Sequence, residues 1–361
     1  MTVIGNTAFA FNVGCIAGTV PAVLLMRRLG LKGTFIFSLV GYNVASALRL
    51  WDVTPMEVYG FAFLAGFFLA ILSVGIPVTI SRLTTVENRG LGFTCFFIAI
   101  IVAGFFGDAI GGELPGILDR LERGHGHDDH LLGSLFIACA LGLAAVLPAL
   151  VMRLASDANP PAMRLPHGPA IRRLITAFAF WSFAVGLFAP FFAVYFSSHL
   201  GASVRTIGLD LATGQIVGAL FTAFAPMWVA AWGPVRSIRF FMFAAGASAF
   251  FMTLTEASLA SGVGYAIYMG YLAMVQPPLN TLLMNAVKPE EQAGASMVNS
   301  LFGFCAVALG GFIGGQLIDA LGYPEMLALA GAGCMAAAVV FVMLVPPDEN
   351  AARVRFARGM T

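Results

Sequence analysis

The sequence predicts an all-α protein that crosses a lipid bilayer many times. Of its 361 residues, 59% are hydrophobic, 33 are Phe and only 10% carry a charge, whereas about 25% of the residues in a soluble domain are charged. The apolar residues form long runs, and roughly 20 of them in a helix suffice to cross the hydrocarbon core. The net charge of +1 offers no large field to attract nucleic acid, so we expect the function to lie within the membrane.

Eleven runs are long and apolar enough to form spanning helices. They lie at approximately 4–26, 33–50, 57–81, 90–112, 131–152, 174–199, 206–231, 238–256, 259–284, 293–318 and 326–346. Short connectors join them, except for 113–130 and the Pro-rich 153–173, "RLASDANPPAMRLPHGPAIRR". The second connector lies near the middle of the chain and predicts a boundary between two bundles.

The basic residues predict the orientation, because Lys and Arg are retained on the cytoplasmic side of a membrane. One set of helix ends and the C-terminal tail hold fifteen of the nineteen Lys and Arg residues. The other set holds only Arg49, Arg120, Arg123 and Arg205. We therefore expect the tail to be cytoplasmic and residue 1 to lie outside.

An internal repeat relates the two halves without a gap. A shift of 203 places Ile4-Gly5 on Ile207-Gly208, Gly30 on Gly233, and "GDAIGGEL" from Gly107 on "GGFIGGQL" from Gly310. We expect two homologous bundles, residues 1–152 and 174–346, joined by a cytoplasmic loop at 153–173 and followed by a cytoplasmic tail at 347–361. Residues 171–203 contain a helix whose repeat partner would precede Met1, so the expected pattern is five helices plus six, with the first of a six-plus-six set missing.

Six plus six helices in parallel repeat, with a basic central loop, resemble the major facilitator superfamily. The run "EEQAGASMVNSLFGFCAVALGGFIGGQLIDALGY" from Glu290 and its counterpart "ENRGLGF" from Glu87 are similar to the family's loops and following helices. The loop "VLLMRRLGLK" departs from the family motif G-x-L-A-D-R-x-G-R-R/K, with Val23 in place of Gly and Arg27 in place of Asp. The resemblance implies a secondary transporter in a lipid bilayer that works by alternating access on a small molecule, needs no cofactor and is not an enzyme.

"GDAIGG" resembles the G-P-x-x-G-G motif of proton-coupled exporters in this family, with Asp108 in place of Pro. A carboxylate inside a span is costly and indicates a proton or substrate site, unless it lies near the outer end and contacts water. Small residues four apart let helices approach closely. We expect helix packing from Gly107, Gly111, Gly112, Gly310, Gly314 and Gly315.

Arg205 and Asp210 open a span at the expected outer face. An acid suits a solvated helix start, which is the simpler interpretation. The resemblance also implies that the family's fifth and eighth helices pack together. In that case Asp108 with Arg205 or Asp210 would form an outer gate that couples transport to protons.

The resemblance implies that spans 57–81, 174–199 and 259–284 line a central cavity. We expect Pro277 and Pro278 to kink the last of these and free backbone carbonyls. An aromatic stripe is more often packing than a binding wall, but rings and amides without a basic residue favour an apolar or weakly polar ligand. The candidate substrate-binding residues are Ser73, Trp181, Phe188, Tyr195, Tyr268, Gln276 and Asn280.

The outer connector "ERGHGHDDH" carries His125, His127 and His130 beside Asp128 and Asp129. Three imidazoles and two acids are able to bind zinc or nickel. A solvated, Gly-interrupted loop is the favoured interpretation, and we expect no metal site.

The favoured function is proton-coupled export of small amphipathic molecules by a monomer in a bacterial cytoplasmic (inner) membrane. A sugar or organic acid importer of the same fold is the first alternative, and a non-transporting receptor or assembly protein is the second. An intramembrane enzyme is not expected, because the sequence offers no nucleophile paired with a base and no nucleotide loop.

Overall fold

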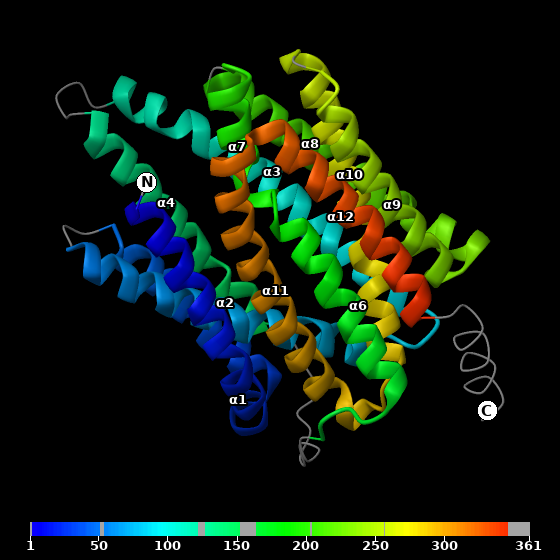
Figure 1. Cartoon of the computed structure of the whole chain (residues 1–361). Coiled ribbons are helices and arrows are strands. Elements are labelled where there is room, and N and C mark those ends of the chain that lie inside the picture. The colour runs from blue at the N-terminus through cyan, green and yellow to red at the C-terminus, as the bar shows by residue number, and fades with distance from the viewer. Residues whose placement is uncertain are drawn as a thin grey trace. The chain divides into compact units, whose positions relative to one another are not determined.

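The computed structural model describes residues 2–50, 54–121, 127–151, 164–202, 204–255 and 257–345, and every regular element within these ranges is a helix. Ten helices in this part of the chain are long and apolar enough to cross a membrane, so the all-α membrane prediction is confirmed. Figure 1 labels most of these helices. The chain forms two compact units, and each of them combines segments from both repeat copies.

Unit 1 comprises Met1–Leu83, Phe106–Pro166 and Val287–Cys305. Its main elements are α1 (Thr2–Leu48), α2 (Pro55–Leu83), α4 (His127–Ala144) and α5 (Val146–Val151). It also holds the end of α3 (Arg89–Leu121) and the start of α11 (Gln292–Leu321). The principal contact within unit 1 is the packing of α1 along α2.

α1 merges the first two expected spans, which is why ten helices are found rather than eleven. A straight helix of its 47 residues would be about 70 Å long, more than twice the roughly 30 Å of the hydrocarbon core. Gly30 interrupts it with a φ of 70° and a ψ of 175°, a combination that is essentially confined to glycine. α1 is therefore two helices that meet at Gly30.

The second repeat copy makes the same turn with the same chemistry. Gly233, the repeat partner of Gly30, has a φ of 78° and separates α8 from α9. The Thr34 hydroxyl donates to the Gly30 carbonyl over 2.7 Å, and the equivalent Ser237 hydroxyl donates to the Gly233 carbonyl over 2.8 Å. The repeat read from the sequence thus extends to matching backbone angles and hydrogen bonds.

Glycines let α1 and α2 touch along their backbones. A Cβ added to Gly14 would lie 2.0 Å from the carbonyl oxygen of Phe63, and one added to Gly66 would lie 2.0 Å from that of Phe11. Such spacing admits no side chain on either helix.

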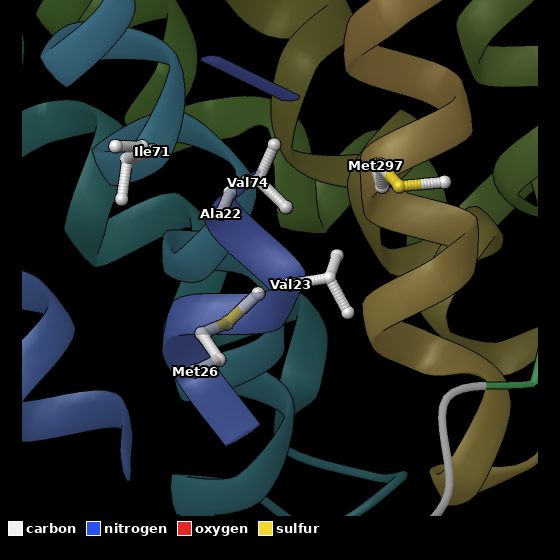
Figure 2. Packing of buried hydrophobic residues seen from close by; sticks show 6 residues of the cluster. All are labelled: Ala22, Val23, Met26, Ile71, Val74 and Met297. Atoms are coloured by element: carbon white, nitrogen blue, oxygen red, sulfur yellow. The ribbon is translucent and has the colours of Figure 1, made fainter. Parts of the chain in front are cut away.

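Further along the same pair lies an apolar cluster. Figure 2 shows Ala22, Val23 and Met26 on α1 beside Ile71 and Val74 on α2, with Met297 coming from α11. The residues of this cluster come from both repeat copies and are all buried.

Unit 2 comprises Thr84–Phe105, His167–Ala286 and Ala306–Thr361. Its long helices, besides parts of α3 and α11, are α6 (Pro169–Gly186), α8 (Val204–Trp232), α9 (Pro234–Met252), α10 (Ser258–Asn285) and α12 (Tyr323–Leu344). α10 packs on α8 and α9, while α12 packs on α9 and α6.

The expected span 174–199 is broken in the middle. α6 stops at Gly186, and the 3₁₀ turn η1 (Ala189–Phe191), the short α7 (Phe192–Val194) and the π-helix η2 (Tyr195–His199) follow it. Pro190 has no N–H to donate to the Gly186 carbonyl, so the regular helix ends there. π turns inside helices are often found at functional sites.

Two expected connectors are shorter than predicted. α3 continues to Leu121 and α4 begins at His127, so most of 113–130 is helical. α6 begins at Pro169, inside the expected loop 153–173. These helices continue beyond their apolar runs, because a helix does not have to stop where the hydrophobic residues do.

Candidate functional site

Six rings in unit 2 form an aromatic cluster: Phe188, Phe192, Tyr195, Phe196, Tyr265 and Tyr268. Phe192 is central, with its ring centroid 4.9 Å from that of Phe188, 4.8 Å from that of Tyr265 and 5.2 Å from that of Tyr268. The angles between these ring planes are 75°, 64° and 47°, within the edge-to-face and tilted geometry that aromatic pairs prefer.

The aromatic cluster brings together three of the seven candidate substrate residues, Phe188, Tyr195 and Tyr268. The first two follow the break after α6, and Tyr268 comes from α10. All three are buried, as is Trp181 on α6. The rings contact one another across the break, so the irregular segment is anchored to α10 through side chains.

The amide candidates lie further along α10. Gln276 and Asn280 are half-buried, and Asn280 donates from Nδ2 to the Gln276 carbonyl over 2.9 Å. Pro277 and Pro278 lie between them inside the helix and lack the N–H groups that would bond to the carbonyls four residues earlier. Ser73 is half-buried on α2 of unit 1.

Asp210 is held against the backbone of α10. A Cβ added to Gly262 would lie 2.6 Å from Asp210 Oδ1, so the carboxylate packs directly on α10 at this glycine. Asp210 Oδ2 is shielded from solvent and has no hydrogen-bond partner among the side chains that are described. A half-buried carboxylate with one oxygen that lacks a hydrogen-bond partner is costly in a membrane and is typical of a functional group.

The other two proposed gate residues are placed only by their backbones. Asp108 belongs to α3 and Arg205 to the first turn of α8. Their side chains lie outside the described part of the structure, so the expected outer gate stays a prediction.

The glycines of α11 contact the end of α6. A Cβ on Gly310 would lie 2.5 Å from the Phe183 carbonyl oxygen, and one on Gly314 would lie 2.0 Å from that of Leu187. At Gly315 the nearest atom is Phe191 Cζ, at 3.4 Å. A Cβ on Gly107 would meet no atom within 4 Å, and the surroundings of Gly111 and Gly112 lie outside the described part.

Sequence reasoning missed a set of polar contacts between the repeat copies. In unit 1 the Ser81 hydroxyl on α2 donates to Gln292 Oε1 on α11 over 2.6 Å, and the Ser296 hydroxyl on α11 donates to the Val74 carbonyl over 2.8 Å. In unit 2 the Arg89 guanidinium at the start of α3 donates to Asn285 Oδ1 at the end of α10.

These contacts follow the internal repeat. Arg89 and Gln292 are equivalent positions under the shift of 203, and each reaches from the start of one helix to the end of a helix in the other copy. The similar loops "ENRG" and "EEQAG" were the signal that could have identified them.

The histidine-rich connector falls outside the described side chains. His125 lies outside the described residues, and the side chains of His127, Asp128, Asp129 and His130 are not described either. Across the described side chains, no group of three or more His, Cys, Asp or Glu residues is placed to hold a metal ion.

Comparison with known proteins gives consistent matches. A model of the Major Facilitator Superfamily matches residues 1–305 and, separately, residues 174–359. Multidrug resistance protein 1 of Bacillus subtilis (strain 168) is 25% identical over 343 residues, which cover 89% of this chain and 83% of that protein.

Two solved structures share the fold. The proton:xylose symporter XylE, bound to 6-bromo-6-deoxy-D-glucose, has a TM-score of 0.75 at 14% identity, covering 95% of this chain and 86% of that one. The E. coli fucose:proton symporter FucP has a TM-score of 0.71 at 16% identity, covering 96% and 91%.

Proposed function

Because the chain belongs to the major facilitator superfamily, and is thus a membrane transporter of the secondary kind rather than an enzyme, we propose that it exports small amphipathic organic molecules in exchange for protons. The proposal rests chiefly on the aromatic cluster, whose rings come from α10 and from the broken segment after α6. The rings carry no fixed charge, and the one imidazole that stacks on them in the described part of the chain is that of His199, on Tyr195; such a lining suits an apolar or weakly polar ligand. The multidrug resistance relative supports the same substrate class.

The proposed binding residues are Ser73, Trp181, Phe188, Tyr195, Tyr268, Gln276 and Asn280. The rings would contact the apolar body of the substrate, and the amides of Gln276 and Asn280 would orient its polar end. The aromatic cluster is closed in this conformation, so rings must separate to admit a ligand. Movement of the short segment Phe192–His199, which is already irregular, would provide this.

Asp210 is the proposed proton carrier, with Asp108 and Arg205 as further candidates for coupling or gating. Protonation would remove a charge from a half-buried carboxylate that packs on Gly262. A charged and a neutral carboxyl differ strongly in their cost within a membrane. Protonation and deprotonation of Asp210 would therefore shift the equilibrium between two arrangements of α8 and α10.

Alternating access would require the polar contacts between the repeat copies to open. The contacts Ser81–Gln292 and Arg89–Asn285 each join a helix of the first copy to one of the second. We propose that they close the cytoplasmic side of the transport path in one state and separate in the other. The location we propose is a bacterial cytoplasmic membrane, with a monomer whose C-terminus is cytoplasmic, because most Lys and Arg residues lie on that side.

A sugar importer is the second candidate. It is favoured by the side-chain amides on α10, because sugars are recognised through polar groups, and the two solved structures above are sugar symporters by name. At 14% and 16% identity they show the fold alone.

Reconstituted liposomes would decide between these functions. We expect ethidium to accumulate in the lumen when the lumen is acidic and to leave when a protonophore is added. Asp210→Asn should abolish the accumulation but retain movement of ethidium down its own gradient. Xylose uptake driven by external acid, without ethidium transport, would establish the importer instead. Equal proton-driven accumulation by wild type and Asp210→Asn would exclude the coupling role of Asp210.

A further inference from the structure

Unit 1 carries an apolar groove on the outside of α1 and α2. The groove encloses about 530 Å³. The α1 residues that line it lie on one face of the helix between Gly33 and Leu48, and Leu64 and Phe68 of α2 form the opposite wall. The lining residues are glycines or carry aliphatic or aromatic side chains. Any occupant must therefore be apolar along the whole length that lies in the groove.

The groove is long, narrow and open at the side. Gly33 and Leu48 are 15 residues apart, which is about 22 Å along a helix. Phe37, Val40 and Val44 are all exposed on its rim, within a helix that is long and apolar enough to cross a membrane. This shape fits an extended hydrocarbon chain better than a compact ring.

One end of the groove is strongly basic. Gly33 directly follows Lys32, and Arg27 and Arg28 lie at the end of the first helix of α1, just before the turn at Gly30. Arg27 and Arg28 are exposed, and the first 51 residues contain no Asp or Glu. Lys32 is already engaged, because its Nζ donates to the Leu150 carbonyl over 2.5 Å.

We infer that the groove is a binding site for one anionic phospholipid, with an acyl chain between α1 and α2 and the phosphate beside Arg27 and Arg28. The apolar groove selects a hydrocarbon chain, and the two guanidiniums select a negative headgroup, since basic residues at a membrane surface attract anionic lipids. The inference depends on the membrane location of the chain and not on the proposed export. It assigns a role to Arg27, which stands where the family motif has an aspartate.

The test is native mass spectrometry of the full chain in detergent. The protein is titrated with phosphatidylglycerol or phosphatidylcholine of identical acyl chains. We expect one phosphatidylglycerol to be retained at much lower concentration than phosphatidylcholine. Val44→Trp, which fills the groove from its rim, should abolish retention of both lipids.

A matched control lies in the other half of α1. Val20 is 47% exposed and Val44 43%, but Val20 lines no part of the groove, so Val20→Trp should bind lipid as wild type does. If Val44→Trp does not stay monodisperse, Val40→Trp on the same rim replaces it. Equal lipid retention by the groove-filling variant and Val20→Trp would overturn the proposal.

The headgroup is tested separately. Arg27→Gln and Arg28→Gln should each weaken phosphatidylglycerol binding about fivefold, the effect of one basic residue at the surface, and leave phosphatidylcholine unchanged. An undiminished preference for phosphatidylglycerol in the double variant would overturn the assignment of the two arginines. Equal binding of both lipids by wild type would show an unselective hydrocarbon groove and would overturn the anionic ligand.

Discussion

Gly30 and Gly233 show how much depends on single residues in this chain. Both hold a positive φ at equivalent places in the repeat, and a Cβ at either would meet no atom within 4 Å. Glycine is therefore required for its backbone conformation and not because neighbouring atoms crowd the position. It follows from the backbone angles alone.

We expect Gly30→Ala and Gly233→Ala each to destabilise the protein by about 1–3 kcal/mol, the typical cost of a side chain in this backbone region. The measurement is the apparent melting temperature in detergent. Gly60→Ala on α2 is the control, because its Cβ would also meet nothing within 4 Å and its backbone is helical. A similar loss in all three variants would contradict the conformational explanation.

The sequence predicted these two glycines as repeat partners but not the surroundings of Asp210. An acid near the start of a span has the same local pattern whether it faces water or a neighbouring helix. The contact with Gly262 depends on how α8 and α10 are aligned, and neither sequence segment contains that information. Candidate polar residues could thus be identified from the chain, whereas their partners required the structure.

At the level of elements, hydrophobic length predicted the spanning helices well because the bilayer imposes one length on all of them. The break after α6 was not predicted, although Pro190 was visible in the sequence. A proline inside a span is often accommodated by a kink, and only packing decides whether the helix resumes. Here it resumes as a π turn.

The contact between α6 and α11 gives a prediction at this scale. Gly310→Ala should cost about 1–3 kcal/mol, as expected for overpacking, because the Phe183 carbonyl lies 2.5 Å from the new Cβ and belongs to rigid backbone. Gly107→Ala, at the equivalent repeat position, should be nearly neutral. Thermal unfolding of both variants under one condition is the measurement, and equal losses would argue against this packing role of Gly310.

At the scale of the whole molecule, the sequence predicted two homologous halves from the repeat. Both compact units nevertheless take helices from both halves. Contacts such as Ser81–Gln292 join residues more than 200 positions apart, and similarity between halves does not predict how they interleave.

The same contact gives a test of alternating access. In a variant lacking the five natural cysteines, Ser81→Cys with Gln292→Cys should react with a short, reducible thiol crosslinker and lose transport. Reduction should restore it, because the crosslink only prevents separation of α2 from α11. The two single-cysteine variants are the controls and should keep transport after the same treatment. Full transport by the crosslinked pair would mean that these helices do not separate during the cycle.

Each unit is assembled from separate segments of the chain, and this sets an order of events during synthesis. Unit 1 needs residues 287–305 to complete it, including Met297, which joins the apolar cluster of α1 and α2. At a translation rate of about 5–20 residues per second, Leu83 would leave the ribosome roughly 10–40 s before those residues. During that interval the nascent α1–α2 pair would be in the membrane without α11, and lipid would cover the surface that α11 later contacts. A ribosome that stalls before residue 287 would therefore release a chain that can complete neither unit.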